Sequence, residues 1–327
     1  MIITLTPNPS IDRTCRIRTE LHRGGVYRLT DAIDVAGGKG VNVANAIHLA
    51  GHSTLALVPV ATSGRFSRLV RAANIPYRTI DTNDEARTNM SIIEPDGTTT
   101  KLNTPGASWE SDTAPRCLNA LRTYAVESTW IVLAGSLPCG VEDRFYLEAI
   151  SALRSANPNI QIAVDTSDRP LAAIAHGLRT GDRSAAPDLM KPNGFELGQL
   201  ADVDGLELEK RACHGDFDDL IAAARKVNDL GVRELLVTLG EAGAILVRKD
   251  EPVLHATSPS IIPLSTVGAG DSALAGYLLA RTAGAQPSEC LTNAVAYGAA
   301  ATALPGTTAP TPEQVHPEQS TVTTLDG

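Results

Sequence analysis

Short apolar runs alternate along the chain with longer stretches that are rich in Ala and Leu. The apolar runs predict strands at Ile2–Thr6, Thr54–Val60, Trp130–Ala134, Ile160–Asp165, Leu189–Lys191, Leu235–Leu239 and Ala244–Val247. The Ala/Leu-rich stretches predict helices at Gly40–Ala50, Arg65–Ala73, Val141–Ala156, Phe217–Leu230, Asp271–Ala283 and Pro287–Ala303. Apolar strands separated by helices are typical of a parallel sheet that is buried on both faces, so we expect a doubly wound α/β domain.

Two stretches break this alternation, Arg13–Val35 and Arg87–Leu102, where Thr, Ile and Tyr alternate loosely with charged residues. The second lies within NMSIIEPDGTTTKLN, in which two short segments flank a Pro-Asp-Gly turn. We therefore expect antiparallel strands outside the main sheet, drawn from about 13–35 and 87–104, that form a small lid on a single domain spanning 1–327. The tail after about residue 310 is rich in Thr, Pro and Glu and is expected to fray.

Composition narrows the function classes. Hydrophobic residues make up 43% of the chain, which is enough for a sizeable core, and the net charge of −9 disfavours nucleic acids and anionic membranes as partners. The five cysteines show no C-x-x-C spacing and the seven histidines no metal-ligand spacing, so we expect reduced thiols and no zinc site. No apolar run approaches the roughly 18 residues of a membrane span, and the first residues, MIITLTPNPSID, predict a strand rather than a signal peptide. We expect a cytoplasmic protein.

The strongest chemical motif is STVGAGDSALAGYLLA, Ser265–Ala280. The turn Gly268-Ala269-Gly270 leads directly into an Ala/Leu helix, whose free N–H groups suit a phosphate. An ionised Asp271 beside that turn can take a proton from a hydroxyl while the amides hold the transferring phosphoryl group. Alternatively, Asp271 is only an N-cap. The two glycines and the small residues around them favour the catalytic hypothesis.

A second glycine-rich motif is DVAGGKGVNVANAIHLAG, Asp34–Gly51. It is neither a P-loop nor a G-x-G-x-x-G fingerprint after a strand. In one hypothesis the loop Gly37–Gly40 binds a sugar, with Asn42 on hydroxyls and Lys39 on a phosphate. In the other it is a plain loop–helix junction with a solvated lysine, and the residues alone favour neither.

Two further motifs carry carboxylates. Asp12, in TPNPSID, either accepts hydrogen bonds from a sugar diol or is an ordinary turn residue. In KPNGFELGQL, Asn193 and Glu196 form N-x-x-E after a predicted strand. They suit the ordering of water around Mg²⁺ and equally a capping box at a helix start, and both roles can hold together.

The remaining motifs are less specific. In VTLGEAGAILV, Val237–Val247, the chain turns between Gly240 and Gly243, which leaves room for a flat ligand such as adenine. GSLPCGV, Gly135–Val141, is a similar strand-end turn. In ARTNM, Arg87 and Asn89 lie on the lid stretch, and Arg87 suits a phosphate clamp. A single Arg is nevertheless more often a solvated surface charge.

In this order the motifs resemble those of the ribokinase-like carbohydrate kinases, the PfkB family, over about residues 1–308. TVGAGDS and AGGKGVNVA are the most specific parts. The resemblance implies a ribokinase-like three-layer α/β/α sandwich with a mostly parallel central sheet and a small β-sheet lid, and it implies phosphoryl transfer from ATP with Mg²⁺.

The resemblance also implies roles for individual residues. Asp271 would be the base, with Gly268, Ala269 and Gly270 as the anion hole. The residues that would bind the sugar phosphate are Asp12, Gly37, Gly38, Lys39, Asn42, Arg87, Asn89, Lys101 and Ser136. Those that would bind ATP are Lys191, Asn193, Thr238, Gly240, Gly243, Gly270 and Asn293. Asn193 and Glu196 would hold Mg²⁺ through water.

Within the family, TPNPSID and GGKG resemble the branch that phosphorylates sugar phosphates. The implied reaction is fructose 1-phosphate to fructose 1,6-bisphosphate, with tagatose 6-phosphate and then fructose 6-phosphate as alternative substrates. Two features depart from the family pattern. The segment 177–193 is longer and more polar, which predicts a surface loop near the nucleotide, and Lys101 stands where some members carry Arg.

Two alternative functions remain open, a non-catalytic sensor and a nucleoside kinase. Asp271 disfavours the sensor, because a pure binder needs no base. Lys39 and Arg87 disfavour the nucleoside kinase, because a neutral nucleoside gains nothing from two cations. Since an exposed lid sheet often needs a partner, a homodimer through the lid is a further prediction.

Overall fold

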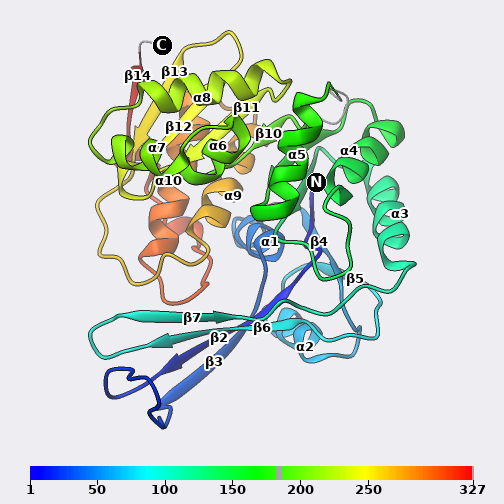
Figure 1. Cartoon of the computed structure of the whole chain (residues 1–327), viewed down its shortest axis with the longest axis vertical. Helices are drawn as coiled ribbons and strands as arrows, with labels where there is room; N and C mark the ends of the chain where they lie inside the picture. Colours follow the sequence, from blue (N-terminus) through cyan, green and yellow to red (C-terminus); the bar gives the residue numbers. More distant parts are fainter. Residues whose placement is uncertain (182–185, 326–327) are drawn as a thin grey trace.

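The computed structural model describes residues 1–181 and 186–325. Its main sheet has ten strands in the order β14-β13-β12-β11-β10-β9-β8-β1-β4-β5 (Figure 1). The strands are β1 (Ile2–Leu5), β4 (Thr54–Pro59), β5 (Tyr77–Ile80), β8 (Trp130–Ala134), β9 (Gln161–Asp165), β10 (Leu189–Met190), β11 (Glu234–Thr238), β12 (Ala244–Arg248), β13 (Val253–Thr257) and β14 (Thr321–Leu325). All neighbours from β5 to β11 pair in parallel, whereas β12, β13 and β14 pair antiparallel.

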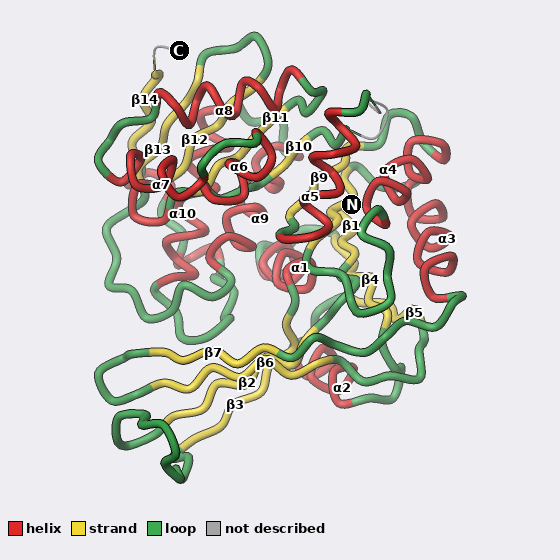
Figure 2. Tube along the Cα trace, in the orientation of Figure 1, coloured by secondary structure: helices red, strands yellow, loops and turns green. Residues whose placement is uncertain are grey.

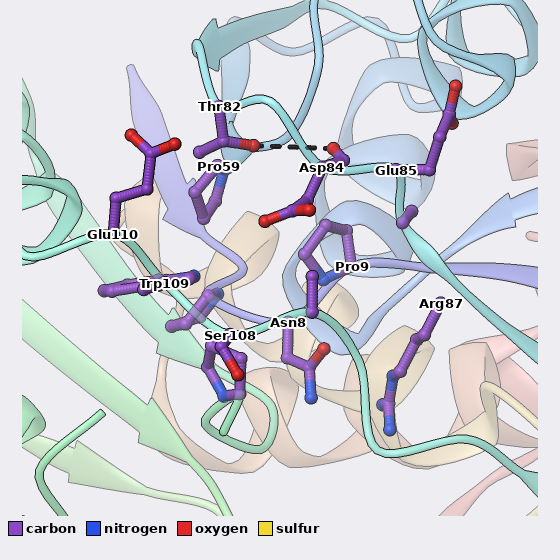
Figure 3. Close-up of a pocket in the computed structure, with 14 residues that line it drawn as sticks. Asn8, Pro9, Pro59, Thr82, Asp84, Glu85, Arg87, Ser108, Trp109 and Glu110 are labelled. Carbon is purple, nitrogen blue, oxygen red and sulfur yellow. Dashed lines mark hydrogen bonds between the residues drawn. The ribbon is translucent and has the colours of Figure 1, made fainter. Parts of the chain in front are cut away.

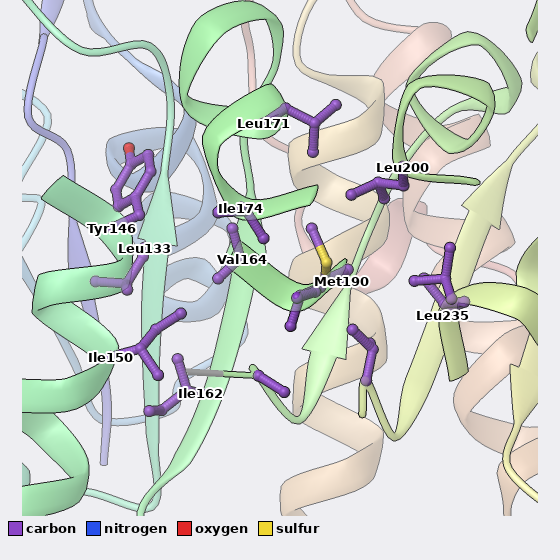
Figure 4. Close-up of a cluster of buried hydrophobic side chains, with 14 of the residues drawn as sticks. Leu133, Tyr146, Ile150, Ile162, Val164, Leu171, Ile174, Met190, Leu200 and Leu235 are labelled. Atoms are coloured by element: carbon purple, nitrogen blue, oxygen red, sulfur yellow. The ribbon is translucent and has the colours of Figure 1, made fainter. Parts of the chain in front are cut away.

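Helices cover both faces of this sheet (Figure 2). One face packs against α3 (Thr113–Ala125), α4 (Phe145–Ala156), α5 (Asp168–Arg179), α6 (Gly194–Ala201), α7 (Gly205–Cys213) and α8 (Asp218–Asp229). The other packs against α1 (Lys39–Leu49), α9 (Ala269–Thr282) and α10 (Pro287–Thr302). Figure 4 shows the first of these layers, where Ile150 and Ile174 of two helices lie over Leu133 and Val164 of the sheet. The predicted three-layer sandwich is confirmed.

The lid is a separate four-stranded sheet in the order β3-β2-β6-β7, below the main sheet in Figure 1. Its strands are β2 (Ser10–Arg16), β3 (Asp31–Gly37), β6 (Arg87–Ile93) and β7 (Thr99–Asn103), and α2 (Arg65–Ala72) lies beside it. One expectation is wrong, because β2 and β6 pair in parallel. Both strands leave the carboxyl end of a parallel strand of the main sheet, β1 and β5, so they run in the same direction.

The tail up to residue 325 has regular structure, contrary to the expectation that it frays. It forms the short 3₁₀ turns η3 (Pro312–Gln314) and η4 (Pro317–Gln319), and then β14, which pairs with β13 from Thr257↔Thr321 to Val253↔Leu325. Val322 and Leu325 pack against the two core clusters, so the tail's β-branched and apolar residues make it an edge strand.

Three other details differ from the sequence-based expectation. The helix predicted from Val141 begins at Phe145, after the turn that follows Pro138. The expected loop 177–193 includes residues 182–185, which lie outside the described residues. The sequence-based set of elements lacks the helices α3, α5, α6 and α7 and the strands β5 and β13. Within the described residues, none of the helices is both long enough and apolar enough to cross a membrane.

Candidate active site

A cleft lies where the carboxyl ends of the parallel strands meet the lid. It is lined by Ser10, Asp12, Gly38, Lys39, Asn42, Arg87, Asn89, Lys191, Asn193, Glu196, Thr238, Val267, Gly268, Gly270 and Asp271. Open α/β sheets bind ligands at this edge. Most of the residues that the motifs singled out are therefore brought together, although they come from segments far apart in the chain.

Asp271 lies in the first turn of α9 and only 7% of its surface is exposed. The N-cap of this helix is Gly268, which has a φ of 81°, so the N-cap interpretation of Asp271 is wrong. Its Oδ2 instead accepts a hydrogen bond of 2.8 Å from Asn42 Nδ2. The N–H groups at the start of a helix have no intrahelical acceptor, and the first turn of α9 therefore presents free donors beside this carboxylate.

The environment of Asp271 raises its pKa from 3.8 to about 6. Burial is the largest cause and the negative charge of Asp165 the second, while Lys39, Asn42 and Lys191 act in the opposite direction. A carboxylate with this pKa is mostly ionised at neutral pH and is a stronger base than an exposed one, as proton abstraction from a hydroxyl requires.

Asp165, which sequence reasoning missed, lies at the end of β9 beside Asp271 and is 1% exposed. Lys39 Nζ lies 2.6 Å from its Oδ1 and Lys191 Nζ lies 3.1 Å from its Oδ2. Burial alone would raise the pKa of Asp165, but the two ammonium groups lower it. The available signal was a carboxylate that ends an apolar strand, which marks the ligand-binding edge of a parallel sheet.

The glycine-rich loop before α1 packs closely against the lid strand β2. Gly38 has a φ of 114°, and a Cβ there would lie 2.7 Å from Thr6 Cγ2. A Cβ at Gly37 would collide with the Asp12 carboxylate, so the loop needs glycine to let Asp12 approach. Asp12 Oδ1 accepts hydrogen bonds from Ser10 Oγ at 2.7 Å and Asn89 Nδ2 at 3.1 Å.

The lid contributes Arg87 to the lining of the cleft and Lys101 to its surroundings. Arg87 Nη1 donates to Thr104 O at 3.1 Å, and within the described chain its buried Nε has no hydrogen-bond partner. Burial lowers the pKa of Arg87, which the negative charge of Asp12 opposes. Arg87 is therefore not a solvated surface charge, which was the alternative hypothesis from the sequence. Lys101 is exposed on β7 and lines an adjoining groove that shares Asp12 and Asn89 with the cleft.

Asn193 and Glu196 form the capping box of α6. Glu196 N donates to Asn193 Oδ1 at 2.7 Å, and Asn193 N donates to Glu196 Oε2 at 2.9 Å. Both residues line the cleft, and the cap bond uses only one of the two Glu196 oxygens. Among residues 1–181 and 186–325, no three His, Cys, Asp or Glu side chains gather closely enough to hold a metal. This donor set fits an ion such as Mg²⁺ that keeps most of its water ligands.

The residues that were expected to bind ATP lie in two separate places. Thr238 lines the cleft, and Gly240 begins the short 3₁₀ turn η2 (Gly240–Ala242), which Gly243 follows directly. Both glycines have a positive φ. Asn293 lies instead on α10, donates to Glu289 O at 2.9 Å, and lines a different groove with Tyr297. Its expected role in ATP binding has no support from this position.

Ser136 is not among the residues that line the cleft, and its Oγ accepts a hydrogen bond of 3.3 Å from Asn8 Nδ2. Asn8 and Arg87 line a second pocket at the ends of β1, β4 and β5, together with Asp84 and Trp109 (Figure 3). Arg87 lines this pocket and the cleft, so it forms the boundary between them.

Comparisons with known proteins identify the family of this chain. The pfkB family carbohydrate kinase model matches residues 7–314. The 1-phosphofructokinase of Haloferax volcanii is 31% identical over 99% of this chain and 100% of its own. The ATP-dependent 6-phosphofructokinase isozyme 2 of Escherichia coli K12 is 32% identical over 94% of both chains. A crystal structure of phosphofructokinase-2 from Escherichia coli in complex with substrates and products superposes with a TM-score of 0.81 at 29% identity, covering 96% of both chains. The chain therefore belongs to the PfkB family of carbohydrate kinases, and it is a sugar-phosphate kinase that transfers phosphate from ATP to a hydroxyl.

Proposed function

We propose that the substrate is fructose 1-phosphate and the product fructose 1,6-bisphosphate. The observation that carries the proposal is a single cleft with a buried base, Asp271, on one side and a partly buried cation, Arg87, on the other. A guanidinium with a free buried N–H suits a substrate that already bears a phosphate. Full-length similarity to 1-phosphofructokinases, 31% identical in one case and 32% in that of Rhodobacter capsulatus, supports fructose 1-phosphate among such sugars.

In the proposed reaction the sugar binds between the lid and the first turn of α9. Asp12 and Asn89 bind ring hydroxyls from the lid, and the amides of the Gly37–Gly40 loop bind from the core. Arg87 holds the phosphate that the substrate brings, and Lys101 adds positive charge nearby. This arrangement aligns the acceptor hydroxyl with Asp271, and positioning of this kind supplies much of the rate in phosphoryl transfer.

Asp271 then accepts the hydroxyl proton as the sugar oxygen forms its bond to the γ-phosphorus of ATP. The bond from that phosphorus to the bridging oxygen of ADP breaks, and ADP leaves with the electron pair. N–H groups of the Gly268–Gly270 turn and the ammonium of Lys191 stabilise the charge on the transferring group. The proton ends on Asp271, from which solvent removes it when the cleft opens.

We place the nucleotide along Thr238, Gly240 and Gly243, with Lys191 and Asn193 at its phosphates. When bound, Mg²⁺ supplies charge neutralisation to those phosphates. Glu196 and Asn193 would hold its water ligands, in keeping with the donor set described above. Glu196 thus combines a structural role in the α6 cap with a role in the metal site.

Tagatose 6-phosphate and fructose 6-phosphate are the alternative substrates. The similarity to the Escherichia coli 6-phosphofructokinase favours the second of these. We also propose a homodimer through the lid, because its strands expose Ile33 and Leu102 by more than half of their surfaces. Light scattering of the purified protein tests it, and a monomer at all concentrations would contradict it.

The reaction is tested by ³¹P NMR of purified enzyme with Mg·ATP and fructose 1-phosphate. The proposal predicts that ADP and a second phosphomonoester signal grow together in equal amounts. Binding of fructose 1-phosphate and ATP without any ADP release would favour the non-catalytic sensor. ADP release with a nucleoside, but with none of the three sugar phosphates, would favour the nucleoside kinase.

A further inference from the structure

One buried carboxylate, Asp165, connects two lysines in the cleft. Its Oδ1 accepts a hydrogen bond of 2.6 Å from Lys39 Nζ, and its Oδ2 forms an ion pair of 3.1 Å with Lys191 Nζ. Lys39 begins α1, Asp165 ends β9, and Lys191 follows β10, so the group joins three separate elements. Asp165 is the member without access to solvent, whereas the side chain of Lys39 is still 32% exposed and therefore reachable by a ligand.

Both ammonium groups lie on the core side of the cleft, where phosphoryl transfer takes place. A Cβ built on Gly270 would lie 3.1 Å from Lys191 Nζ, which places this cation against the first turn of α9. Burial tends to lower the pKa of Lys39, but the carboxylates of Asp165, Asp271 and Glu196 around it raise that pKa above its usual value. Lys39 is thus surrounded by the acids of the core rather than by the lid.

The chemistry of the group explains why a carboxylate is needed there. Two ammonium groups so close together in a partly dry site repel each other, and each loses hydration. A shared carboxylate between them offsets both costs and fixes both positions. The carboxylate of Asp165 also offsets the effect of the two cations on Asp271. Without it, the cations would lower the pKa of Asp271 and make it a weaker base.

We infer that Asp165 is a positioning residue for phosphoryl transfer, which fixes Lys39 and Lys191 beside the first turn of α9. A consequence is that Lys39 acts on the transferring phosphoryl group and not in the clamp for the phosphate of the sugar. The clamp then consists of the lid cations, Arg87 and Lys101. The inference rests on the proposed role of Asp271 as the base.

The test compares Asp165→Asn with Asp188→Asn in the full-length protein. Asp188 is a matched control, because it is also buried and also lies between two cations, with Arg154 Nη2 at 2.6 Å and Arg233 Nη1 at 3.2 Å. Asp188 directly precedes β10, at the amino ends of the parallel strands, whereas the cleft lies at their carboxyl ends. Asp188 is not among the residues that line the cleft. Both variants lose a buried charge of the same kind, so both are expected to melt at lower temperature.

Only Asp165→Asn is expected to change the chemistry. We expect kcat to fall by about 10²-fold, while KM for fructose 1-phosphate changes by less than about threefold. The groups that face Asp271 are Asp165, Lys39, Asn42 and Lys191. Loss of the Asp165 charge leaves the two lysines free to stabilise ionised Asp271, so the acid limb of kcat/KM should move about one unit to lower pH.

Asp188→Asn should keep the wild-type kcat and acid limb below its melting temperature. An Asp165→Asn protein with wild-type kcat and acid limb, altered in stability alone, would overturn the inference. Asp271→Asn separates it from the proposed function. If that variant keeps its activity, the base assignment fails, whereas an inactive Asp271→Asn beside an unaffected Asp165→Asn rejects the role of Asp165 alone.

Lys39→Gln keeps the inference testable if Asp165→Asn does not fold, because it alters a partly exposed side chain. We expect it to lower kcat by about tenfold or more, with KM for the sugar phosphate nearly unchanged. The opposite pattern, a KM for the sugar phosphate raised at least tenfold with kcat retained, would place Lys39 in the phosphate clamp and overturn the inference.

Discussion

Replacement of Asp271 by Asn separates the catalytic role of this side chain from its effect on stability. Asn keeps the shape of the side chain and a partner for Asn42 but cannot accept the hydroxyl proton. Loss of a general base of this kind lowers kcat by about 10²–10⁴. KM for the sugar phosphate should change little, because the proposed sugar contacts come from the lid and from the glycine-rich loop.

The raised pKa of Asp271 fixes the expected pH dependence. The base must be ionised, so kcat/KM of the wild type should fall about tenfold per pH unit once the pH drops below the pKa of about 6. Above that pH the rate should be flat until another group titrates. This acid limb should be absent from the residual activity of Asp271→Asn, which no longer has a group to protonate.

The same pKa predicts that Asp271→Asn stabilises the protein. The folded pKa of about 6 lies above the ordinary value of 3.8, so ionisation opposes folding, and the cost develops as the pH rises from about 4 to 6. At neutral pH its upper limit is on the order of 3 kcal/mol, and Asn avoids it. Urea denaturation of both proteins at about pH 5 and pH 7 measures the change.

Two results would contradict the role of Asp271 as a buried base. A kcat within about threefold of the wild type would show that another group accepts the proton. A variant that is less stable than the wild type at neutral pH would show that the carboxylate is favoured by its surroundings rather than strained by burial. The acid limb and the stability are independent measurements of one pKa, so they must agree.

Three further predictions follow from the cleft. Arg87→Gln should raise KM for the sugar phosphate by about tenfold or more without altering KM for ATP, since a charged hydrogen bond contributes about 1.5–3 kcal/mol. Equal effects on the two KM values would contradict the role of Arg87 in the phosphate clamp. Gly243→Ala should lower the free energy of unfolding by about 1 kcal/mol or more, because φ is 84° there and a Cβ would collide with Ala256 O. An unchanged midpoint of urea denaturation would contradict this prediction. Glu196→Gln keeps an acceptor for the α6 cap, so the variant should fold normally, but it should need several-fold more Mg²⁺ for half-maximal rate. An unchanged Mg²⁺ dependence would show that Glu196 is not part of the metal site.

The sequence predicted the strands that are apolar along their whole length and the helices that are rich in Ala and Leu. Strands such as Trp130–Ala134 are apolar throughout because both faces are covered, and that pattern is visible without a structure. The tail was misjudged for the opposite reason. Thr321–Leu325 is only half covered, and its polar composition resembles a frayed end until β13 is known to lie beside it.

The site was predictable as a set of motifs but not as an arrangement. Gly268, Gly270 and Asp271 are close in sequence, so their chemistry could be inferred locally. The hydrogen bond from Asn42 to Asp271 spans 229 positions, and the Lys39–Asp165 pair spans 126, so only the fold shows them. Asp165 was missed because its importance depends on two lysines that the chain brings to it from different elements.

The cleft fits a sugar that already carries a phosphate. The most direct test is kcat/KM from ADP formation with fructose 1-phosphate, tagatose 6-phosphate, fructose 6-phosphate and free fructose under one set of conditions. We expect the largest value for fructose 1-phosphate, by about tenfold or more, which corresponds to roughly 1.4 kcal/mol in transition-state binding. Turnover of free fructose at or above the rate of every sugar phosphate would contradict the proposed phosphate clamp, since Arg87 and Lys101 would then have no phosphate to bind.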